Sequence, residues 1–149
     1  MWTYNNKEFT GEEIGEYFGM VYLITNLRTN RKYVGKKFFT KAARRQVKGK
    51  SKKVRVASDW EKYYGSNKVI QEEVKNLGED VFKREILHLC KTRSECAYWE
   101  TWEIFTREAL RTHDYYNDWV SCRIRKAHLL SKPDTATYKP KMRRPASNR

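Results

Sequence analysis

The clearest pattern along the chain is a pair of short apolar stretches in which β-branched and aromatic residues dominate. They cover residues 21–25 and 32–35, and a polar stretch at 26–31 separates them. Two such runs joined by a short polar segment are typical of a β-hairpin. Because side chains repeat every second residue along a strand, Tyr22 and Tyr33, eleven residues apart, can point to one side of it. Two converging phenol groups could hydrogen-bond a phosphate; the alternative is that they only pack the sheet.

A helix is predicted after an aromatic-rich segment in the middle of the chain. Apolar residues recur with helical spacing over residues 69–75, and Gly78 follows as a residue that readily ends a helix. Ser66 or Asn67 would cap its N-terminus, because short polar side chains accept hydrogen bonds from free backbone N–H groups there. Trp60, in the preceding segment, is expected to belong to the core.

A third strand and a long helix are predicted in the second half of the chain. Residues 81–90 are rich in apolar and β-branched side chains and are expected to form the strand. Thr92 or Ser94 then precedes a helix expected over residues 95–111. The resulting order, β-β-α-β-α, indicates an α/β (α+β) fold for the body of the chain.

Length and composition limit the class of protein. With 149 residues the chain has room for one domain with its own core. Its formal net charge of +14 favours an anionic partner, and a positive excess interleaved with aromatic residues suits nucleic acid. No apolar run approaches the length of a membrane-spanning helix, and the N-terminus lacks the basic-then-apolar order of a signal peptide. We therefore expect no membrane partner and a cytoplasmic location.

The charge is unevenly distributed and suggests three segments. Residues 1–18 are mildly acidic, and we expect them to form an N-terminal extension that does not touch nucleic acid. Residues 19–122 contain the predicted elements and would form the functional domain. Residues 123–149 are basic and contain the three prolines of the chain. We expect them to form a flexible tail from about residue 131, which would either embrace nucleic acid or only keep the protein soluble.

A dense basic block covers residues 36–55, directly after the second tyrosine stretch. It contains ten basic residues and no acidic one, so its charges repel one another unless a partner neutralises them. We expect a loop, mobile in the free protein, that contacts DNA phosphates. Its candidate DNA-binding residues are Lys37, Lys41, Arg45, Lys48, Lys50, Lys52, Lys53 and Arg55.

The blocks Gly19-Met20-Val21-Tyr22 and Tyr33-Val34-Gly35 resemble the paired motifs of the GIY-YIG nuclease superfamily. The inner residues of both blocks depart from those motifs only conservatively. The aromatic segment 58–67 is similar to segments in a phage-encoded branch of that superfamily, the Seg-like homing endonucleases. This resemblance implies a small, largely antiparallel three-stranded sheet flanked by helices. It also implies hydrolysis of double-stranded DNA with one Mg²⁺ or Mn²⁺ ion per active site.

The resemblance also assigns a metal ligand and an arginine. The family's metal-binding glutamate lies on the helix after the third strand, where we choose Glu100, since Glu95 suits the helix N-terminus and Glu103 the surface. A carboxylate on an apolar helix face is costly to bury without a cation, although an arginine could pair with it instead. The family's arginine, on a helix after the second tyrosine motif, corresponds to Arg44, with Arg45 as the alternative.

The implied mechanism is attack of water on a phosphodiester, leaving 5′-phosphate and 3′-hydroxyl ends. Tyr22 would be the general base or relay to one, which requires nearby cations to lower the pKa of its phenol from about 10. Tyr33 would hydrogen-bond the attacked phosphate or the nucleophilic water, and Lys36 could share this function. Arg44 would stabilise the extra charge of the transition state. Asn117 would orient groups, although it could equally be a turn residue.

Further candidates and alternatives remain open. Tyr63 or Tyr64 could contact phosphate, and Ser66 and Asn67 could bind the scissile group at a helix N-terminus. A double-strand cut would need a homodimer on the DNA, two sequential nicks or two binding events. The alternatives to a nuclease are a catalytically inactive nucleic-acid-binding protein of the same fold and a small structural or ribosome-associated basic protein.

Overall fold

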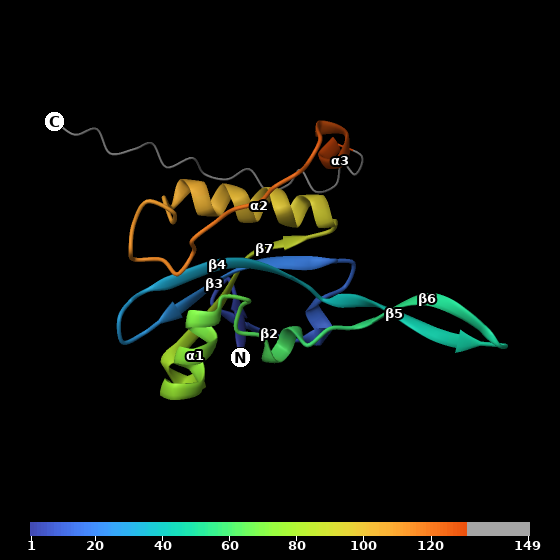
Figure 1. Ribbon diagram of the computed structural model, residues 1–149, viewed down its shortest axis with the longest axis horizontal. Coiled ribbons are helices and arrows are strands. Elements are labelled where there is room, and N and C mark those ends of the chain that lie inside the picture. Colours follow the sequence, from blue (N-terminus) through green and yellow to red (C-terminus); the bar gives the residue numbers. More distant parts are fainter. Residues whose placement is uncertain (131–149) are drawn as a thin grey trace.

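The computed structural model describes residues 1–130, which form a five-stranded sheet with helices on its faces and a separate two-stranded ribbon (Figure 1). The strand order of the sheet is β2-β1-β7-β3-β4. Its strands are β1 (Trp2–Tyr4), β2 (Lys7–Phe9), β3 (Gly19–Asn26), β4 (Lys32–Phe38) and β7 (Phe82–Cys90). The ribbon consists of β5 (Thr40–Val47) and β6 (Lys50–Ala57). The helices are α1 (Lys68–Leu77), α2 (Arg93–Thr106) and α3 (Lys126–Leu130), with short 3₁₀ turns at Gly11–Glu13, Trp60–Lys62 and Glu79–Val81.

The predicted hairpin is confirmed as β3 and β4, which pair in antiparallel register with Tyr22 opposite Gly35. The turn between the strands is built around Asn26, whose side-chain oxygen accepts hydrogen bonds from two backbone N–H groups of the turn at 3.0 and 3.3 Å. A short polar side chain thereby replaces partners that the turning backbone loses. Paired residues share a face in antiparallel strands, so Tyr22 and Tyr33 point to one side of the sheet.

The sheet has five strands, whereas the resemblance implied three. The two additional strands, β1 and β2, come from the segment 1–18 that we expected to be an extension. β1 lies parallel to β7. The indole N–H of Trp2, a buried side chain, donates to the carbonyl of Trp60 at 2.9 Å, and Trp60 belongs to the core as predicted. Strands of three residues are too short to leave a periodic pattern in a sequence.

The two faces of the sheet are covered by different helices (Figure 1). β3 is buried along its whole length, and its side chains alternate between the two sides. Tyr22 and Ile24 belong to the core that includes Ile70 of α1, whereas Val21 belongs to the core that includes Ile104 of α2. β4 is an edge strand of the sheet, so its outer side is open to other segments of the chain.

The helix predicted in the middle of the chain is confirmed as α1. Asn67, rather than Ser66, is its cap, because the Asn67 side-chain oxygen accepts hydrogen bonds from the backbone N–H groups of Val69 and Ile70 at 2.9 and 3.3 Å. Gly78 ends the helix with a φ of 89°, a conformation that suits a residue without a Cβ.

The long helix is confirmed as α2, but it ends at Thr106 and not at residue 111. Its cap is Thr92, whose hydroxyl accepts a hydrogen bond from the N–H of Glu95 at 3.1 Å. The early end has a local cause, because Glu108 adopts a φ of 52°, the left-handed conformation in which helices commonly terminate. None of the helices in residues 1–130 is long and apolar enough to cross a membrane.

The basic block is a β-ribbon and not a loop. Its first residues, 36–38, end β4, and Phe39 joins β4 to β5. The other residues lie in or between β5 and β6, which pair only with each other. The expected helix with Arg44 or Arg45 is wrong, since both residues lie on β5, opposite Lys53 and Lys52 of β6. Valines between the basic residues favour a strand over a helix here.

Glu103 is buried, although we expected it at the surface. Its two carboxylate oxygens have different partners: His88 Nε2 lies 2.7 Å from Oε1, and Arg107 Nε donates to Oε2 at 2.6 Å. Burial alone would raise the pKa of this carboxyl group, but the hydrogen bonds with His88 and Arg107 outweigh burial. The pKa of Glu103 therefore lies below its ordinary value of 4.5.

Replacing Glu103 tests this network. We expect Glu103→Gln to lower the free energy of unfolding at neutral pH by about 1–3 kcal/mol, because the partly buried guanidinium of Arg107 loses its charged partner. A depressed pKa means that the carboxylate stabilises the fold above its ordinary pKa of 4.5 and that this stabilisation is lost as pH falls through the folded-state value. The difference between wild type and variant should therefore shrink in acid, which urea unfolding at a series of pH values measures.

The matched control is Glu108→Gln, since the Glu108 carboxylate is exposed and pairs with Arg111 at 3.2 Å. Exposed pairs of this kind contribute at most about 1 kcal/mol. An equal loss in both variants, or a difference that grows toward acid pH, would contradict the assignment.

Candidate active site

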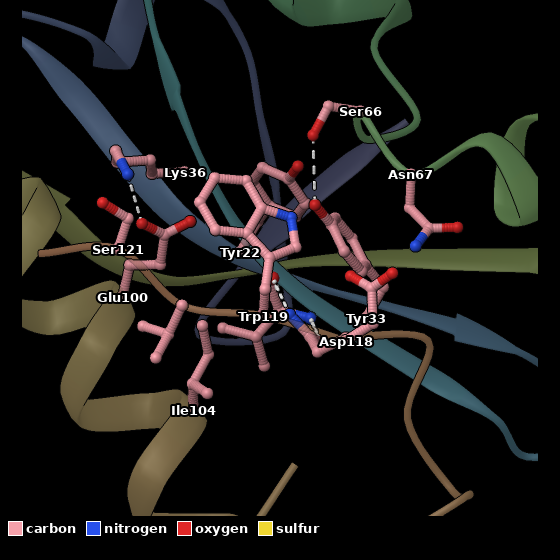
Figure 2. A pocket seen from close by; sticks show the side chains of 13 residues that line it. Tyr22, Tyr33, Lys36, Ser66, Asn67, Glu100, Ile104, Asp118, Trp119 and Ser121 are labelled. Atoms are coloured by element: carbon pink, nitrogen blue, oxygen red, sulfur yellow. Dashed lines mark hydrogen bonds and ion pairs between the residues drawn. The ribbon is translucent and has the colours of Figure 1, made fainter. Parts of the chain in front are cut away.

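A pocket of ≈ 480 Å³ opens at the outer edge of β4 (Figure 2). The β3–β4 hairpin, the start of α1, α2 and the segment 117–121 meet there. The lining residues are Tyr22, Tyr33, Val34, Lys36, Ser66, Asn67, Glu100, Ile104, Asn117, Asp118, Trp119, Val120 and Ser121. The fold thus brings together seven of the residues that the sequence singled out, namely Tyr22, Tyr33, Lys36, Ser66, Asn67, Glu100 and Asn117.

The missing side chain of Gly35 is what lets Tyr22 reach this pocket. A Cβ atom added to Gly35 would lie 2.6 Å from Cζ of Tyr22 and 3.0 Å from Cε1 of Tyr33. Such distances are shorter than van der Waals contact, so the ring of Tyr22 crosses β4 over the bare backbone of Gly35. Gly35 of the second motif therefore leaves room for the rings of both tyrosines.

Tyr22 is a buried, neutral phenol. It is 1% exposed, and its ring packs edge-on against Trp2 and Tyr63, with centroids 5.3 and 6.0 Å away. Burial raises the pKa of Tyr22 well above its ordinary value of 10.0, and the nearby Tyr33 and Glu100 add to this effect. The environment therefore disfavours the phenolate, contrary to our expectation that surrounding cations would stabilise it.

Tyr33 is held between the pocket and the loop before α1. Its hydroxyl lies 3.2 Å from Oγ of Ser66, and both side chains line the pocket (Figure 2). Gly65, with a φ of 88°, packs so closely on the ring that an added Cβ would lie 3.0 Å from Cε1 of Tyr33. Burial raises the pKa of Tyr33, while the hydrogen bond with Ser66 works in the opposite direction. The hydroxyl groups of Tyr33 and Ser66 are thus hydrogen-bonded to each other at one wall of the pocket.

Glu100 from α2 meets Lys36 from β4 across the pocket wall. The Lys36 ammonium donates to Oε2 of Glu100 in a close ion pair (Figure 2). The side chain of Glu100 is 16% exposed and that of Lys36 is 30% exposed, so a ligand in the pocket can reach the pair. Within residues 1–130, the carboxylate is therefore compensated by the lysine that directly follows the second motif and not by an arginine.

The donor groups suit a metal that needs few protein ligands. No group of three or more His, Cys, Asp or Glu that could hold a metal ion occurs within residues 1–130. Mg²⁺ keeps several waters and is commonly bound by one or two carboxylates together with phosphate oxygens. Among the pocket residues, Glu100 could supply one such carboxylate, while Asp118 lies beside Tyr33, away from Glu100 (Figure 2).

Asn117 fastens the segment that follows α2 to the edge strand. Its Oδ1 accepts a hydrogen bond from the N–H of Val34 at 2.9 Å, and its Nδ2 donates to the carbonyl of Val34 at 2.8 Å. One side chain thus satisfies both backbone groups of an edge residue, which would otherwise lack a partner. The clamp places residues 117–121 over the pocket, and the orienting function of Asn117 stays a prediction.

Arg44 and Arg45 lie outside the pocket, exposed on β5. The first α-helix after the second tyrosine motif is α1, and the whole ribbon lies between β4 and α1. Counting eleven residues from Tyr33 therefore ends in the ribbon instead of on a helix. Lys36 is the single basic residue among the described residues that line the pocket.

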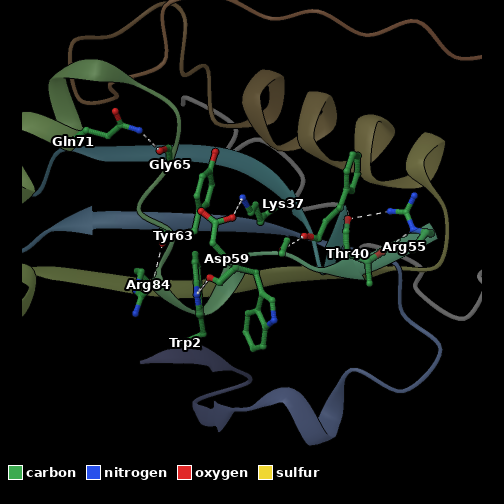
Figure 3. Close-up of polar contacts among 12 residues, drawn as sticks. Trp2, Lys37, Thr40, Arg55, Asp59, Tyr63, Gly65, Gln71 and Arg84 are labelled. Carbon is green, nitrogen blue, oxygen red and sulfur yellow. Dashed lines mark hydrogen bonds and ion pairs between the residues drawn. The ribbon is translucent and has the colours of Figure 1, made fainter. Parts of the chain in front are cut away.

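Outside the pocket, four of the predicted DNA-binding residues have partners inside the protein, namely Lys37, Arg55, Tyr63 and Tyr64. Figure 3 shows the first three of them. Lys37 donates to Oδ1 of Asp59 at 2.7 Å, and its ammonium lies 3.8 Å from the ring centroid of Tyr63. The guanidinium of Arg84 lies 4.1 Å from the ring centroid of Tyr64. These contacts favour a structural function for the aromatic segment before α1. The other candidates, on the ribbon and at its tip, are exposed.

The sequence analysis missed the residues that follow Asn117. Trp119 is 71% exposed and lines the pocket, which is unusual for the largest aromatic side chain. A lone tryptophan in a polar stretch was the available signal. Asp118 and Ser121 offered none, because only the clamp by Asn117 brings them to the pocket.

Substituting Gly35 tests the packing that defines the site. We expect Gly35→Ala to destabilise the fold by about 1–3 kcal/mol and to move the Tyr22 ring, because the new methyl group overlaps it. Thermal unfolding and tyrosine ring NMR signals measure both effects. Gly11→Ala is the control, since an added Cβ there meets no atom closer than 3.9 Å. Equal stability of the two variants would mean that β4 moves without cost and that the close approach of Gly35 and Tyr22 does not limit the packing of the site.

Comparison with known proteins identifies the family of the chain. A family model described as "Putative endonuclease segE, GIY-YIG domain" matches residues 2–120. The chain is 35% identical over 100 residues to the "Putative endonuclease segE" of Enterobacteria phage T4; the match covers 67% of this chain and 40% of that relative. The chain thus spans well under half the length of the curated relative, and no solved structure matches it. The chain belongs to the segE group of the GIY-YIG endonuclease family.

Proposed function

We propose that this protein is a metal-dependent DNA endonuclease that hydrolyses phosphodiester bonds to 5′-phosphate and 3′-hydroxyl ends. The observation that carries the proposal is the convergence of Tyr22, Tyr33, Lys36 and Glu100 on one open pocket. Three of these residues come from the β3–β4 hairpin, and Glu100 comes from α2, 64 residues after Lys36. Packing alone gives no reason to place an ion pair and phenol groups around a shared opening, whereas an anionic substrate does.

The pocket offers hydrogen-bond donors for one phosphate group. The hydroxyls of Tyr33 and Ser66 and the ammonium of Lys36 line it, so the phosphate would accept hydrogen bonds from two neutral donors and one cation. Donors that are already oriented stabilise the charge that develops in a phosphoryl transition state without costly rearrangement. Lys36 would provide the positive charge that we first assigned to Arg44.

The raised pKa of Tyr22 determines how this residue would act. As a neutral phenol, it would accept a hydrogen bond from the attacking water and donate its own proton to a phosphate oxygen, which relays the proton without a stable phenolate. The water oxygen then bonds to phosphorus, the bond to the 3′-oxygen breaks, and that oxygen takes up the proton that Tyr22 gave to the phosphate. Proton transfer through a positioned side chain typically contributes about 10²–10⁴-fold in rate.

Glu100 would hold one Mg²⁺ or Mn²⁺ ion, with waters and substrate oxygens as the other ligands. When bound, the ion would stabilise negative charge on the leaving oxygen. Lys36 shares the carboxylate of Glu100, so its ammonium holds this side chain in place at the pocket wall.

The biological setting follows from the relative and is equally part of the proposal. The similar protein belongs to a phage, so a homing-type function on double-stranded DNA in the host cytoplasm is the simplest setting. A homodimer on the DNA would allow both strands to be cut. The second candidate is a catalytically inactive binding protein of the same fold, which the neutralised Glu100 and the lack of an arginine among the described pocket residues favour.

Cleavage of supercoiled plasmid with Mg²⁺ or EDTA separates these candidates. We expect Mg²⁺-dependent nicking that Glu100→Ala reduces by about a hundredfold or more, because a metal contributes several kcal/mol to the transition state. Gel-shift binding of the variant should persist. Glu108→Ala removes an exposed carboxylate and is the control. Binding without cleavage in wild type would leave only the inactive binder.

Removal of a single hydroxyl group tests the relay. We expect Tyr22→Phe to reduce the nicking rate by about 10²–10⁴-fold while the fold is preserved, because the ring and its packing remain. Tyr98→Phe, at a tyrosine 38% exposed on α2, should retain full activity. Nicking by Tyr22→Phe at the wild-type rate would show that the hydroxyl takes no part in proton transfer.

A further inference from the structure

The β5–β6 ribbon extends away from the sheet as a separate hairpin (Figure 1). Each strand has eight residues, which corresponds to a reach of roughly 26 Å at about 3.3 Å per residue. Lys48 and Gly49 form the tip with φ angles of 50° and 72°. Positive φ at both residues of a two-residue loop gives the turn whose twist matches a β-hairpin. The ribbon is therefore a regular element and not a loop.

The two faces of the ribbon differ in chemistry. Residues that are directly paired in antiparallel strands share a face, so the register assigns every residue to one side. One side, here called the polar face, carries Thr40, Ala42, Arg44, Gln46, Ser51, Lys53, Arg55 and Ala57. The other side, here called the valine face, carries Lys41, Ala43, Arg45, Val47, Lys50, Lys52, Val54 and Val56.

The polar face carries free hydrogen-bonding groups toward the tip of the ribbon. Arg44, Gln46, Ser51 and Lys53 are all exposed. Within residues 1–130, their side chains form none of the hydrogen bonds or ion pairs of the structure. On the valine face, Ala43, Val54 and Val56 are partly buried. The cations of the valine face, Lys41, Arg45, Lys50 and Lys52, are equally exposed and form no ion pair within residues 1–130. The polar face differs because it combines its cations with amide and hydroxyl side chains, which can both donate and accept hydrogen bonds.

The charge of the ribbon requires an anionic partner. Residues 40–57 contain eight lysines and arginines and no acidic residue. Arg44 lies directly opposite Lys53, and Arg45 lies directly opposite Lys52. Like charges in cross-strand pairs destabilise a hairpin, and a two-stranded ribbon alone is only marginally stable in water. A polyanion along the ribbon would remove this repulsion.

The base of the ribbon is fixed to the core, so its direction relative to the pocket is defined (Figure 3). Arg55 donates to Oγ1 and to the carbonyl of Thr40 at 2.8 and 2.9 Å. Ser58 donates to the carbonyl of Phe38 at 2.6 Å. Phe39, at the junction with β4, is buried against Phe9. Tyr33, Lys36 and the ribbon therefore lie on one continuous stretch of chain.

We propose that the β5–β6 ribbon enters the major groove of DNA beside the scissile phosphate, with Arg44, Gln46, Ser51 and Lys53 directed at base edges. This inference rests on the proposed function, since it takes DNA as the substrate. The cations of the valine face have long side chains that reach the phosphates on the two walls of the groove. The ribbon thus makes the protein select where it cuts, at base pairs away from the pocket.

The dimensions and the side chains favour the major groove. The major groove is about 12 Å wide and admits a two-stranded ribbon, whereas the minor groove is only about 6 Å wide. Arginine and lysine pair with guanine O6 and N7, glutamine pairs with adenine N6 and N7, and serine accepts or donates at either base. Arg44, Lys53, Gln46 and Ser51 are those residue types, and they occupy two adjacent rows of one face.

Two double variants with equal loss of charge provide the test. Arg44→Ala/Lys53→Ala removes two cations from the polar face, and Arg45→Ala/Lys52→Ala removes two from the adjacent row of the valine face. Each purified protein is bound to a pool of random-sequence duplexes in EDTA, and the bound fraction is sequenced. We expect the polar-face variant to lose sequence enrichment by about tenfold or more. The valine-face variant should keep the wild-type preference and show a salt slope lower by about 1.8.

A third variant covers the case in which a double variant fails to fold. Gln46→Ala changes no charge and lies near the exposed tip of the ribbon. We expect it to alter the enriched sequences and to leave the salt slope unchanged. Equal effects of both double variants, a wild type without sequence enrichment, or an unchanged preference in Gln46→Ala would each overturn the proposal.

Modified duplexes identify the groove. DNA that contains 7-deazapurines lacks the N7 acceptors of the major groove, and DNA that contains inosine lacks the guanine amino group of the minor groove. We expect 7-deazapurine DNA to weaken wild-type binding about tenfold and to weaken binding by Arg44→Ala/Lys53→Ala clearly less, because that variant retains only Gln46 as a partner for N7. Sensitivity to inosine alone would place the ribbon in the minor groove and overturn the proposal.

Binding and cleavage are measured separately, so the two proposals can fail independently. Sequence preference that depends on the ribbon, without Mg²⁺-dependent nicking, would support the ribbon proposal and contradict the proposed endonuclease function. Mg²⁺-dependent nicking with a sequence preference that does not depend on the ribbon would support the endonuclease function and contradict the ribbon proposal.

Discussion

The close approach of Tyr22 to the backbone of Gly35 is the constraint on which the rest of the site depends. Because the ring crosses an edge strand that lacks a Cβ, a side chain rooted in the core can reach a pocket at the rim of the sheet. The opposite wall is equally tight, since Gly65 packs on the ring of Tyr33. Protein interiors have little spare volume, so strand register, the tyrosine pair and the start of α1 are fixed together.

β4 connects this constraint to the parts of the molecule outside the core. Its inner edge pairs with β3, and Asn117 occupies part of its outer edge through both backbone groups of Val34. Its end continues through the buried Phe39 into the ribbon (Figure 1). An edge strand is normally a liability, because its unpaired groups attract other strands. In this protein the edge of β4 helps to form the pocket, because the hydrogen bonds of Asn117 that cover it also bring Asp118 and Trp119 to the pocket.

The sequence was informative where a pattern repeats over enough residues. The hairpin, both long helices, the shared face of Tyr22 and Tyr33, and the position of Glu100 on the pocket side of α2 followed from periodicity and from the family motifs. The short strands β1 and β2 have no such pattern, and the pairing of β1 with β7, which adds both strands to the sheet, is a tertiary effect. Arg44 was misplaced because counting along a chain cannot detect an inserted ribbon. The burial of Glu103 depends on His88, which is distant in sequence.

The distribution of charge suggests that attraction and chemistry are separated in space. In the pocket, Lys36 and Glu100 neutralise each other, so the site has little net field to draw DNA from a distance. The ribbon has uncompensated positive charge along its entire length and is the stronger source of long-range attraction. Salt screens exposed charges far more than a partly buried pair. Rising ionic strength should therefore weaken the encounter with DNA before it affects the arrangement of the pocket, so that affinity and the chemical step respond differently to salt.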